Sequence, residues 1–306
     1  MARYSRMVAL VKIETTYGTD SVPSGTNAVL MNSVDLIPQE ADQVERSMVL
    51  PWLGNRPVTL VSQRARLQCA INLGGGGAAG NVPGFGPLLR ACGLSQTLTA
   101  STRVDFAPVS VAEDAVTCYI YPDGKLHALL GTRGTFGLDI QGGQMPRATF
   151  DLTGLYVAPT AVALPSAGTN GYNTAIPVNQ ANTPTCTLDG QAVILRSFTY
   201  THGNSMQVRD LPGARAIRIA SRAPSATITI EDPDALTPNF FSAIGTNVAF
   251  NLVHGTTAGN IVEVTLGQAR VLNPRYSDDD NVRMLTFDLR PEPTTAGNDE
   301  FNLRIR

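Results

Sequence analysis

Lysine is almost missing from this chain of 306 residues. Only Lys12 and Lys125 occur, so 21 of the 23 basic residues are arginine (23 minus 2). Basic and acidic residues nearly balance, at 23 against 25, which gives a formal net charge of -2. This balance excludes a polybasic membrane anchor and a strongly basic nucleic-acid grip over the whole chain. Arginine suits packed polar interfaces because its guanidinium is flat, bidentate and weakly hydrated, but a high-GC coding bias would produce the same excess.

Long apolar runs and paired cysteines are also missing. The N-terminal run at residues 7–11 is too short for the core of a signal peptide or for a membrane span. No CxxC spacing links the four cysteines, which predicts a chain made in a reducing cytosol. Two of them, Cys69 and Cys92, are expected to be small core residues. The cysteines are Cys69, Cys92, Cys118 and Cys186. We expect no membrane partner.

Aromatic residues are sparse. They make up 6% of the chain, and Trp52 is the single tryptophan. A surface carbohydrate- or receptor-binding β-sandwich would use clustered exposed aromatics. The composition therefore gives that function thin support, and it stays as the alternative interpretation.

The residue types that usually carry catalysis form no complete motif in this sequence. The glycine-rich stretch at residues 74–80 lacks the GK[ST] ending of a phosphate loop, which favours a flexible surface loop. His127, His202 and His254 each stand alone, without ligand spacing to a cysteine or carboxylate. Ser205 lacks the second glycine of a nucleophile elbow. We therefore predict no catalytic residue, no cofactor, no metal site and no enzyme activity, and we disfavour a β-rich hydrolase.

The sequence does contain many glycine and proline residues, and segments in which apolar and polar residues alternate. Glycine (28) and proline (20) divide it into short segments, and 43% hydrophobic residues supply a core. Along residues 61–71 apolar and polar side chains largely alternate, as in a half-buried strand. Residues 226–230 alternate in the same phase. A shift of 159 residues lays Leu67, Cys69 and Ile71 on Ala226, Ile228 and Ile230.

Two further segments recur in the same order. Residues 87–93 match residues 239–245 as a short helix that ends at glycine, and residues 149–152 match residues 286–289 as a closing strand. We therefore predict a mainly β protein of two tandem, duplicated domains. Each would be an antiparallel sandwich or barrel with one short helix. The predicted divisions are residues 1–156 for an N-terminal arm plus the first domain, 157–184 for a linker, and 185–306 for the second domain.

Several segments resemble a known family. They are residues 12–20, the loop and helix at 84–93, the turn around 123–125, and residues 131–134 and 147–156. Together they resemble the major tail tube protein of long-tailed, non-contractile bacteriophages, over most of the chain.

The resemblance implies a structural virion protein that stacks as rings into a hollow tail tube, assembled in the host bacterial cytoplasm. Double-stranded DNA would pass through the lumen without specific binding. Partners would be other copies of the chain, a tape measure protein, a tail terminator and distal tail proteins. Most tubes of this family use six copies of one domain per ring. A tandem chain therefore predicts rings of three copies with pseudo-sixfold walls.

Contacts between subunits are expected in the N-terminal segment, the glycine-rich loop and the hairpin turns. The predicted contact residues are Lys12, Tyr17, Asp20, Gly74, Gly76, Gly77, Pro122, Asp123, Lys125, His254 and Asn260. Arg64 and Arg66 lie on the polar face of one strand and would face an interface or the lumen. Residues 1–42 are expected to act as an arm between rings.

Overall fold

The protein is mainly β, as the sequence predicts. The computed structural model describes residues 6–168, 171–233 and 239–306. These residues form nineteen strands, one α-helix and two short 3-10 turns. The helix is α1 (Gly86–Ala91), and the turns are η1 (Gly25–Asn27) and η2 (Phe240–Ala243).

In the first half of the chain, six strands pair in the order β2–β3–β8–β7–β6–β1. Alternating sequence explains the single buried face of β8, where Ala148, Phe150 and Leu152 point into the core, whereas β6 is buried on both faces. The six strands are β1 Met7–Ile13, β2 Ser33–Glu45, β3 Val58–Asn72, β6 Val116–Pro122, β7 Lys125–Gln141 and β8 Arg147–Tyr156. Shorter strands lie beside them: β4 Thr97–Thr99, β5 Arg103–Phe106 and β9 Thr160–Ala161.

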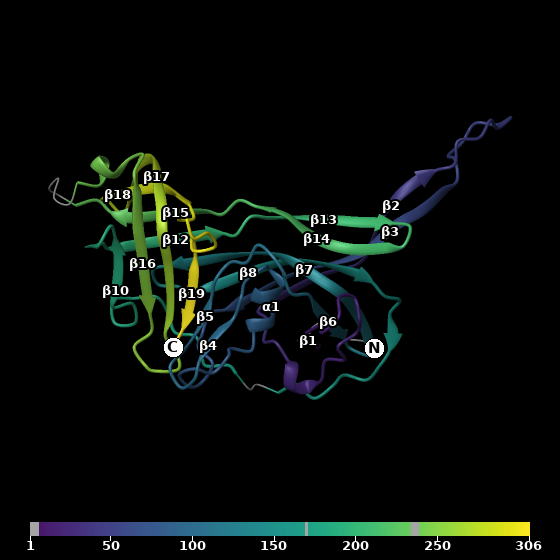
Figure 1. Cartoon of the computed structure of the whole chain (residues 1–306), viewed down its shortest axis with the longest axis horizontal. Helices are drawn as coiled ribbons and strands as arrows, with labels where there is room; N and C mark the ends of the chain where they lie inside the picture. Colours follow the sequence, from purple (N-terminus) through teal and green to yellow (C-terminus); the bar gives the residue numbers. More distant parts are fainter. Residues whose placement is uncertain (1–5, 169–170, 234–238) are drawn as a thin grey trace.

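In the second half, six strands pair in the order β12–β15–β18–β17–β16–β10. They are β10 Thr185–Leu188, β12 Leu195–Thr201, β15 Ser225–Glu231, β16 Asn247–His254, β17 Val262–Asp279 and β18 Val282–Pro291. The remaining strands are β11 Gln191–Ala192, β13 Asn204–Leu211, β14 Ala214–Arg222 and β19 Asn302–Ile305. The β13–β14 hairpin lies across the first half, below the projecting β2–β3 hairpin (Figure 1).

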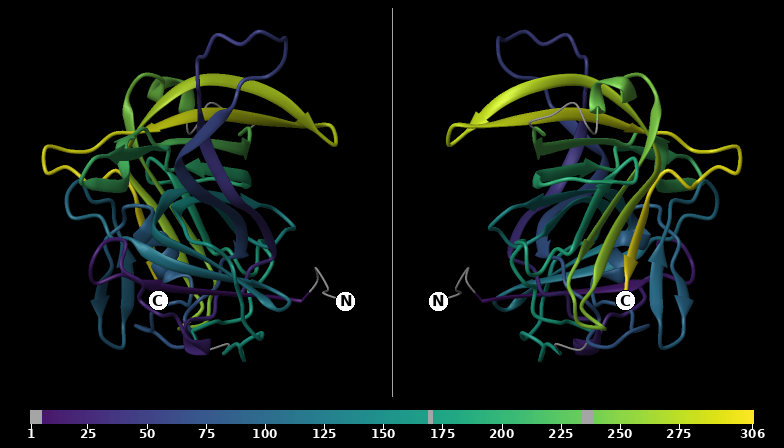
Figure 2. Two further views of the ribbon diagram at one scale, coloured as in Figure 1. Left: turned by 90° about the vertical axis from the view of Figure 1, so that its right-hand side faces the viewer. Right: turned by 90° about the vertical axis from the view of Figure 1, so that its left-hand side faces the viewer.

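One continuous sheet joins the halves. The distal part of β7 pairs with β12, with Leu138 opposite Tyr200. The result is a run of eight strands in the order β2–β3–β8–β7–β12–β15–β18–β17, which we call the long sheet. The β2–β3 and β17–β18 hairpins extend beyond the body on the same side of the molecule (Figure 2).

The two halves also share register. In the first half Leu67 lies opposite Leu152. In the second half Ala226 lies opposite Leu289. Shifts of 159 and 137 residues map one pair onto the other, and these are the shifts at which the sequence repeats. The two halves therefore have the same strand order and the same pairing at these positions.

Three expectations need correction. The second short helix is a 3-10 turn, η2, where Asn239 accepts a hydrogen bond from the Phe241 N–H. Residues 7–13 are not part of an extended arm. They form β1, because their apolar side chains are buried beside β6. Residues 1–5 of the expected arm lie outside the described residues. The glycine-rich loop is not a free surface loop, since Gly74–Gly76 are buried.

Residues 157–184 follow the surface of the first half in their described parts. Two backbone hydrogen bonds hold them there. The Gly168 N–H donates to the Gly25 carbonyl and the Val178 N–H donates to the Gln144 carbonyl, each at 2.8 Å. Val178 is buried. The segment therefore joins the two halves while packing on the first.

Candidate assembly surface

The solvent side of the long sheet is rich in hydroxyls. Where Phe136, Phe150 and Phe287 point into the core, the alternate positions carry short polar side chains. On β7, β8, β12, β15 and β18 these include Thr135, Thr149, Thr153, Ser197, Thr199, Thr201, Thr227, Thr229 and Thr286. This face is polar without being strongly charged.

Two arginines on this face, Arg66 and Arg275, are paired with carboxylates. Arg66 on β3 binds Asp151 on β8 in a bidentate pair, with 2.7 Å between Nε and Oδ1. This guanidinium holds the pKa of the Asp151 carboxyl below its ordinary value. Arg275 on β17 donates to Asp288 on β18 at 2.7 Å. Each pair links neighbouring strands. On the same face, Arg147 is exposed and donates to the Ser33 hydroxyl at 3.3 Å.

Arg64 lies further along β3, at the base of the projecting hairpin. Its guanidinium donates to Glu40 at 3.3 Å and to Asp42 at 3.1 Å, both on β2. The two arginines singled out in the sequence therefore cross-link neighbouring strands.

Both edges of the long sheet are open in the described part of the chain. β2 pairs with β3 on one side only. At the other end, residues 275–279 of β17 pair with β18 on one side only. Open edges present unpaired backbone N–H and C=O groups, which bind further strands. These edges were not found from sequence, because alternation shows that a segment is a strand but not which strand lies beside it.

The junction between the halves shows how one such edge is filled. Beyond the β7–β12 pairing, the β13–β14 hairpin packs on the first half. The Ile217 N–H donates to the Tyr17 hydroxyl at 2.5 Å, and Arg133 donates to the Ile217 carbonyl at 3.2 Å. The Asn204 amide donates to Cys92 at 2.7 Å. Tyr17, predicted as a contact between subunits, thus makes a contact between the halves of one chain.

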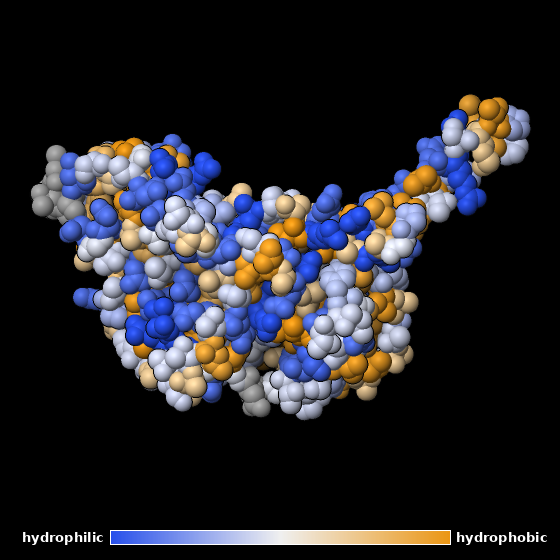
Figure 3. All heavy atoms as spheres, in the orientation of Figure 1, coloured by the Kyte–Doolittle hydropathy of each residue, from blue (hydrophilic) through white to orange (hydrophobic). Residues whose placement is uncertain are grey.

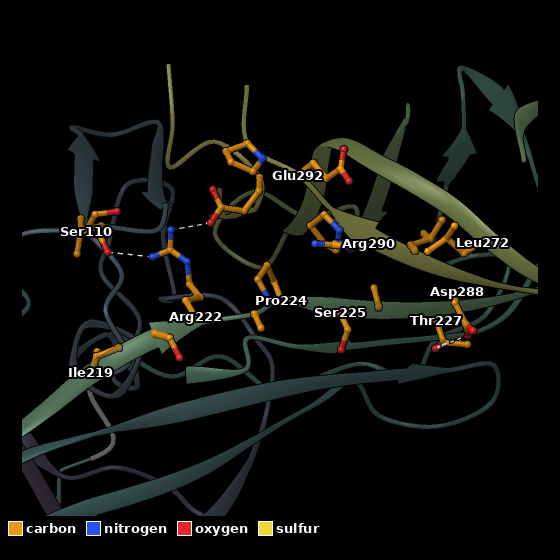
Figure 4. Close-up of a pocket in the computed structure, with 18 of the residues that line it drawn as sticks. Ser110, Ile219, Arg222, Pro224, Ser225, Thr227, Leu272, Asp288, Arg290 and Glu292 are labelled. Carbon is orange, nitrogen blue, oxygen red and sulfur yellow. Dashed lines mark hydrogen bonds and ion pairs between the residues drawn. The ribbon is translucent and has the colours of Figure 1, made fainter. Parts of the chain in front are cut away.

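A groove of about 990 Å3 lies where β14 leads into β15 (Figure 4). Arg222 donates there to the Val109 carbonyl at 2.9 Å and pairs with Glu300 at 2.7 Å. Glu300 is buried, at 3% exposure. The charged groups therefore bind each other and tie three segments together, and they form no nucleophile–base pair.

Part of the predicted contact set is used inside the chain. The Gly75 N–H donates to the Asn260 side chain at 2.7 Å, so the glycine-rich loop, including Gly74 and Gly76, packs on the turn between β16 and β17. His254 is buried, with Nδ1 at 2.9 Å from the Thr183 hydroxyl and Nε2 at 3.1 Å from the Ile176 carbonyl. These contacts join the two halves and the segment between them.

The other predicted contact residues lie nearer the surface. Lys12, Gly77 and Lys125 are exposed. Pro122 and Asp123, at the turn between β6 and β7, are half-buried. Asp20 accepts hydrogen bonds from the Tyr119 hydroxyl and from the Val22 N–H. For all the predicted contact residues a role between subunits stays a prediction.

The described residues contain no group of three or more His, Cys, Asp or Glu side chains that could hold a metal. Burial raises the pKa of the Cys69 and Cys186 thiols to about 12, so neither is a thiolate at neutral pH. In the described part of the chain, no helix is both long and apolar enough to cross a membrane.

These features define a mainly β protein with a polar sheet face and, in its described part, an open edge at each end of the long sheet. A family model described as phage tail tube protein matches residues 5–299. Because this match covers nearly the whole chain, the chain belongs to the phage tail tube protein family and is a component of the virion tail. The resemblance seen in the sequence is confirmed. The family is structural and is not known as an enzyme family. Among curated proteins no match was found.

Proposed function

We propose that the chain polymerises as stacked rings into the hollow tube of a long, non-contractile phage tail, through which genome DNA is delivered. The observation that carries the proposal is the long sheet, which is continuous within one chain and open at both ends. A sheet closed around a ring has no free edges, so ring formation removes the exposed backbone groups.

We further propose that the halves arose by duplication and serve as two consecutive wall segments. The first would span residues 1–156 and the second residues 185–306. Equal strand order and equal register support this, since each half supplies four strands to the long sheet. Three copies would then supply six segments, and a ring would have threefold symmetry with a pseudo-sixfold wall.

The polar face of the long sheet would line the lumen. Threonine hydroxyls give a hydrated wall, and the pairing of Arg66 with Asp151 and of Arg275 with Asp288 neutralises two of the cations that could hold phosphates. DNA could then pass without specific binding. The tape measure protein would occupy the same lumen before ejection, and the tail terminator and distal tail proteins would meet the ends of the tube.

Negative-stain electron microscopy of the purified protein tests the proposal. Tubes with a central channel are the expected result, alone or after addition of a tape measure protein. Dispersed single chains under both conditions would contradict it and would favour the alternative, a surface module that binds carbohydrate or a receptor.

A further inference from the structure

We propose that consecutive copies are joined as the two halves of one chain are joined. The free edge of β2 pairs with residues 275–279 of β17 in the neighbouring copy, with Leu36 opposite Tyr276. The β2–β3 hairpin then packs on the neighbour's η2 turn at Gly245. This inference rests on the proposed ring assembly and specifies its interface, and the partner is a second copy of this chain.

The first step is to find the position on β17 that corresponds to the internal junction. Leu138 on β7 lies opposite Ala148 on β8. The shift of 137 residues takes Ala148 to Leu285 on β18, which lies opposite Tyr276 on β17. Tyr276 therefore corresponds to Leu138.

The position on β2 that corresponds to the internal junction is found in the same way. Tyr200 on β12 lies opposite Ala226 on β15. Leu67 corresponds to Ala226, and Leu67 lies opposite Leu36 on β2. Leu36 therefore corresponds to Tyr200.

Inside the chain, Tyr200 and Leu138 lie opposite each other. They are 1% and 2% exposed, because the junction covers them. Their counterparts Leu36 and Tyr276 are at opposite ends of the long sheet, and Tyr276 is 58% exposed. Pairing two copies in the same register would cover Tyr276 and fill both open edges.

The β13–β14 and β2–β3 hairpins carry equivalent side chains that differ in burial. In the β13–β14 hairpin, Ile217 is fully buried on the first half and Ile219 lies against Gly93, at the end of α1. The shift of 159 residues takes these two isoleucines to Val58 and Leu60 of the β2–β3 hairpin, which are 50% and 45% exposed. Equivalent side chains are thus buried where a neighbouring half is present and exposed where it is absent.

The surface on which the hairpin packs also occurs in both halves. Gly93 and Gly245 end the corresponding helix and 3-10 turn, with φ of 78° and 77°. Ile219 covers Gly93, whereas no atom of the residues that the structure describes lies within 4 Å of a Cβ built on Gly245. Ile244 beside it is 40% exposed. Leu60 of the neighbouring copy fits this uncovered position.

Exposed apolar side chains gather on the β2–β3 hairpin, with hydrophobic groups both at the tip of the projection and nearer the body (Figure 3). They are Ile37, Val44, Met48, Val49, Trp52, Leu53, Val58, Leu60 and Val61. A projecting apolar segment of this kind marks an interaction surface.

Cysteine cross-linking tests the register. The double variant Leu36→Cys/Tyr276→Cys is assembled and treated with a short thiol cross-linker, since directly opposed Cβ atoms lie about 5 Å apart. We expect covalent dimers and trimers on a denaturing gel. The matched control is Leu36→Cys/Ser277→Cys, in which the two thiols point to opposite faces of the sheet. The native cysteines are buried or half-buried.

The outcomes separate the interface from the function. Tubes that form without cross-links in the first variant, or with equal cross-linking in the control, overturn the proposed junction and leave the tube function standing. Absence of tubes from the unaltered chain, both alone and after addition of a tape measure protein, overturns the function itself.

A second variant tests the hairpin. Leu60→Asp should yield a folded chain, by circular dichroism, that forms no tubes. The control Leu98→Asp changes a 54% exposed leucine on β4, outside the long sheet, and should assemble normally. Normal tubes from Leu60→Asp would overturn the docking of the hairpin.

Discussion

At the scale of single residues, the chain neutralises its charges internally. Arg66, Arg275 and Arg304 each donate to a carboxylate on a neighbouring strand. The excess of arginine over lysine fits this use, because a guanidinium can bind both oxygens of one carboxylate. The sequence indicated the arginines but not their partners, since Asp151 is 85 residues from Arg66.

His202 should make stability depend on pH. It is fully buried, with Nδ1 at 2.9 Å from the Tyr200 hydroxyl. Burial, together with the nearby charge of Arg222, lowers the pKa of the imidazole to about 3. In the unfolded chain that pKa is about 6.5, so below it the unfolded state binds more protons. Stability should therefore fall as pH drops from 7 to 5, by about 2 kcal/mol.

Urea unfolding of the unassembled chain at the two pH values measures this effect. His202→Gln should remove most of the difference. An equal pH dependence in the variant would show that other groups cause it.

The Arg222–Glu300 pair should be costly to break from one side. Arg222→Met leaves the Glu300 carboxylate buried and uncompensated, with an expected loss of about 3 kcal/mol in the free energy of unfolding. The double variant Arg222→Met/Glu300→Gln should regain most of that loss. The control Arg209→Met, on the exposed part of β13, should change stability by less than about 0.5 kcal/mol. Additive losses in the double variant would contradict the coupling.

At the scale of elements, loops and hairpins hold the halves together. Gly75 in the glycine-rich loop has no room for a side chain, because it packs directly against the backbone of Gly259. Gly75→Ala would place a Cβ on that carbonyl, and we expect a loss of about 2 kcal/mol in unfolding free energy. Gly142→Ala is the matched control, since its Cβ would lie at an ordinary 3.5 Å from the Arg196 carbonyl. Equal stability of the two variants would contradict this packing.

Some elements could be predicted from sequence and others could not. Half-buried strands such as β3 and β15 were found because alternate residues must face core and solvent. The η2 turn was wrongly predicted as a helix, since the apolar spacing of Phe240 and Phe241 fits either structure over so few residues. The β7–β12 junction was not predicted, because Leu138 and Tyr200 meet only through tertiary pairing.

At the scale of the whole molecule, charge pairing on the long sheet should govern DNA transit. Asp151→Asn frees the Arg66 guanidinium to contact phosphates, which should slow DNA release from particles by roughly two- to fivefold, as for one exposed ionic contact. The double variant Arg66→Gln/Asp151→Asn removes the carboxylate without leaving a free guanidinium at this pair, and release should be nearly normal. Equal release rates for both variants would contradict a lumenal position for Arg66.

Ring symmetry tests the central claim most directly. Reconstruction of the tube by electron cryomicroscopy should show three chains per ring, with first and second halves alternating around one unbroken β wall. Six chains per ring, or second halves lying outside the wall, would contradict the account.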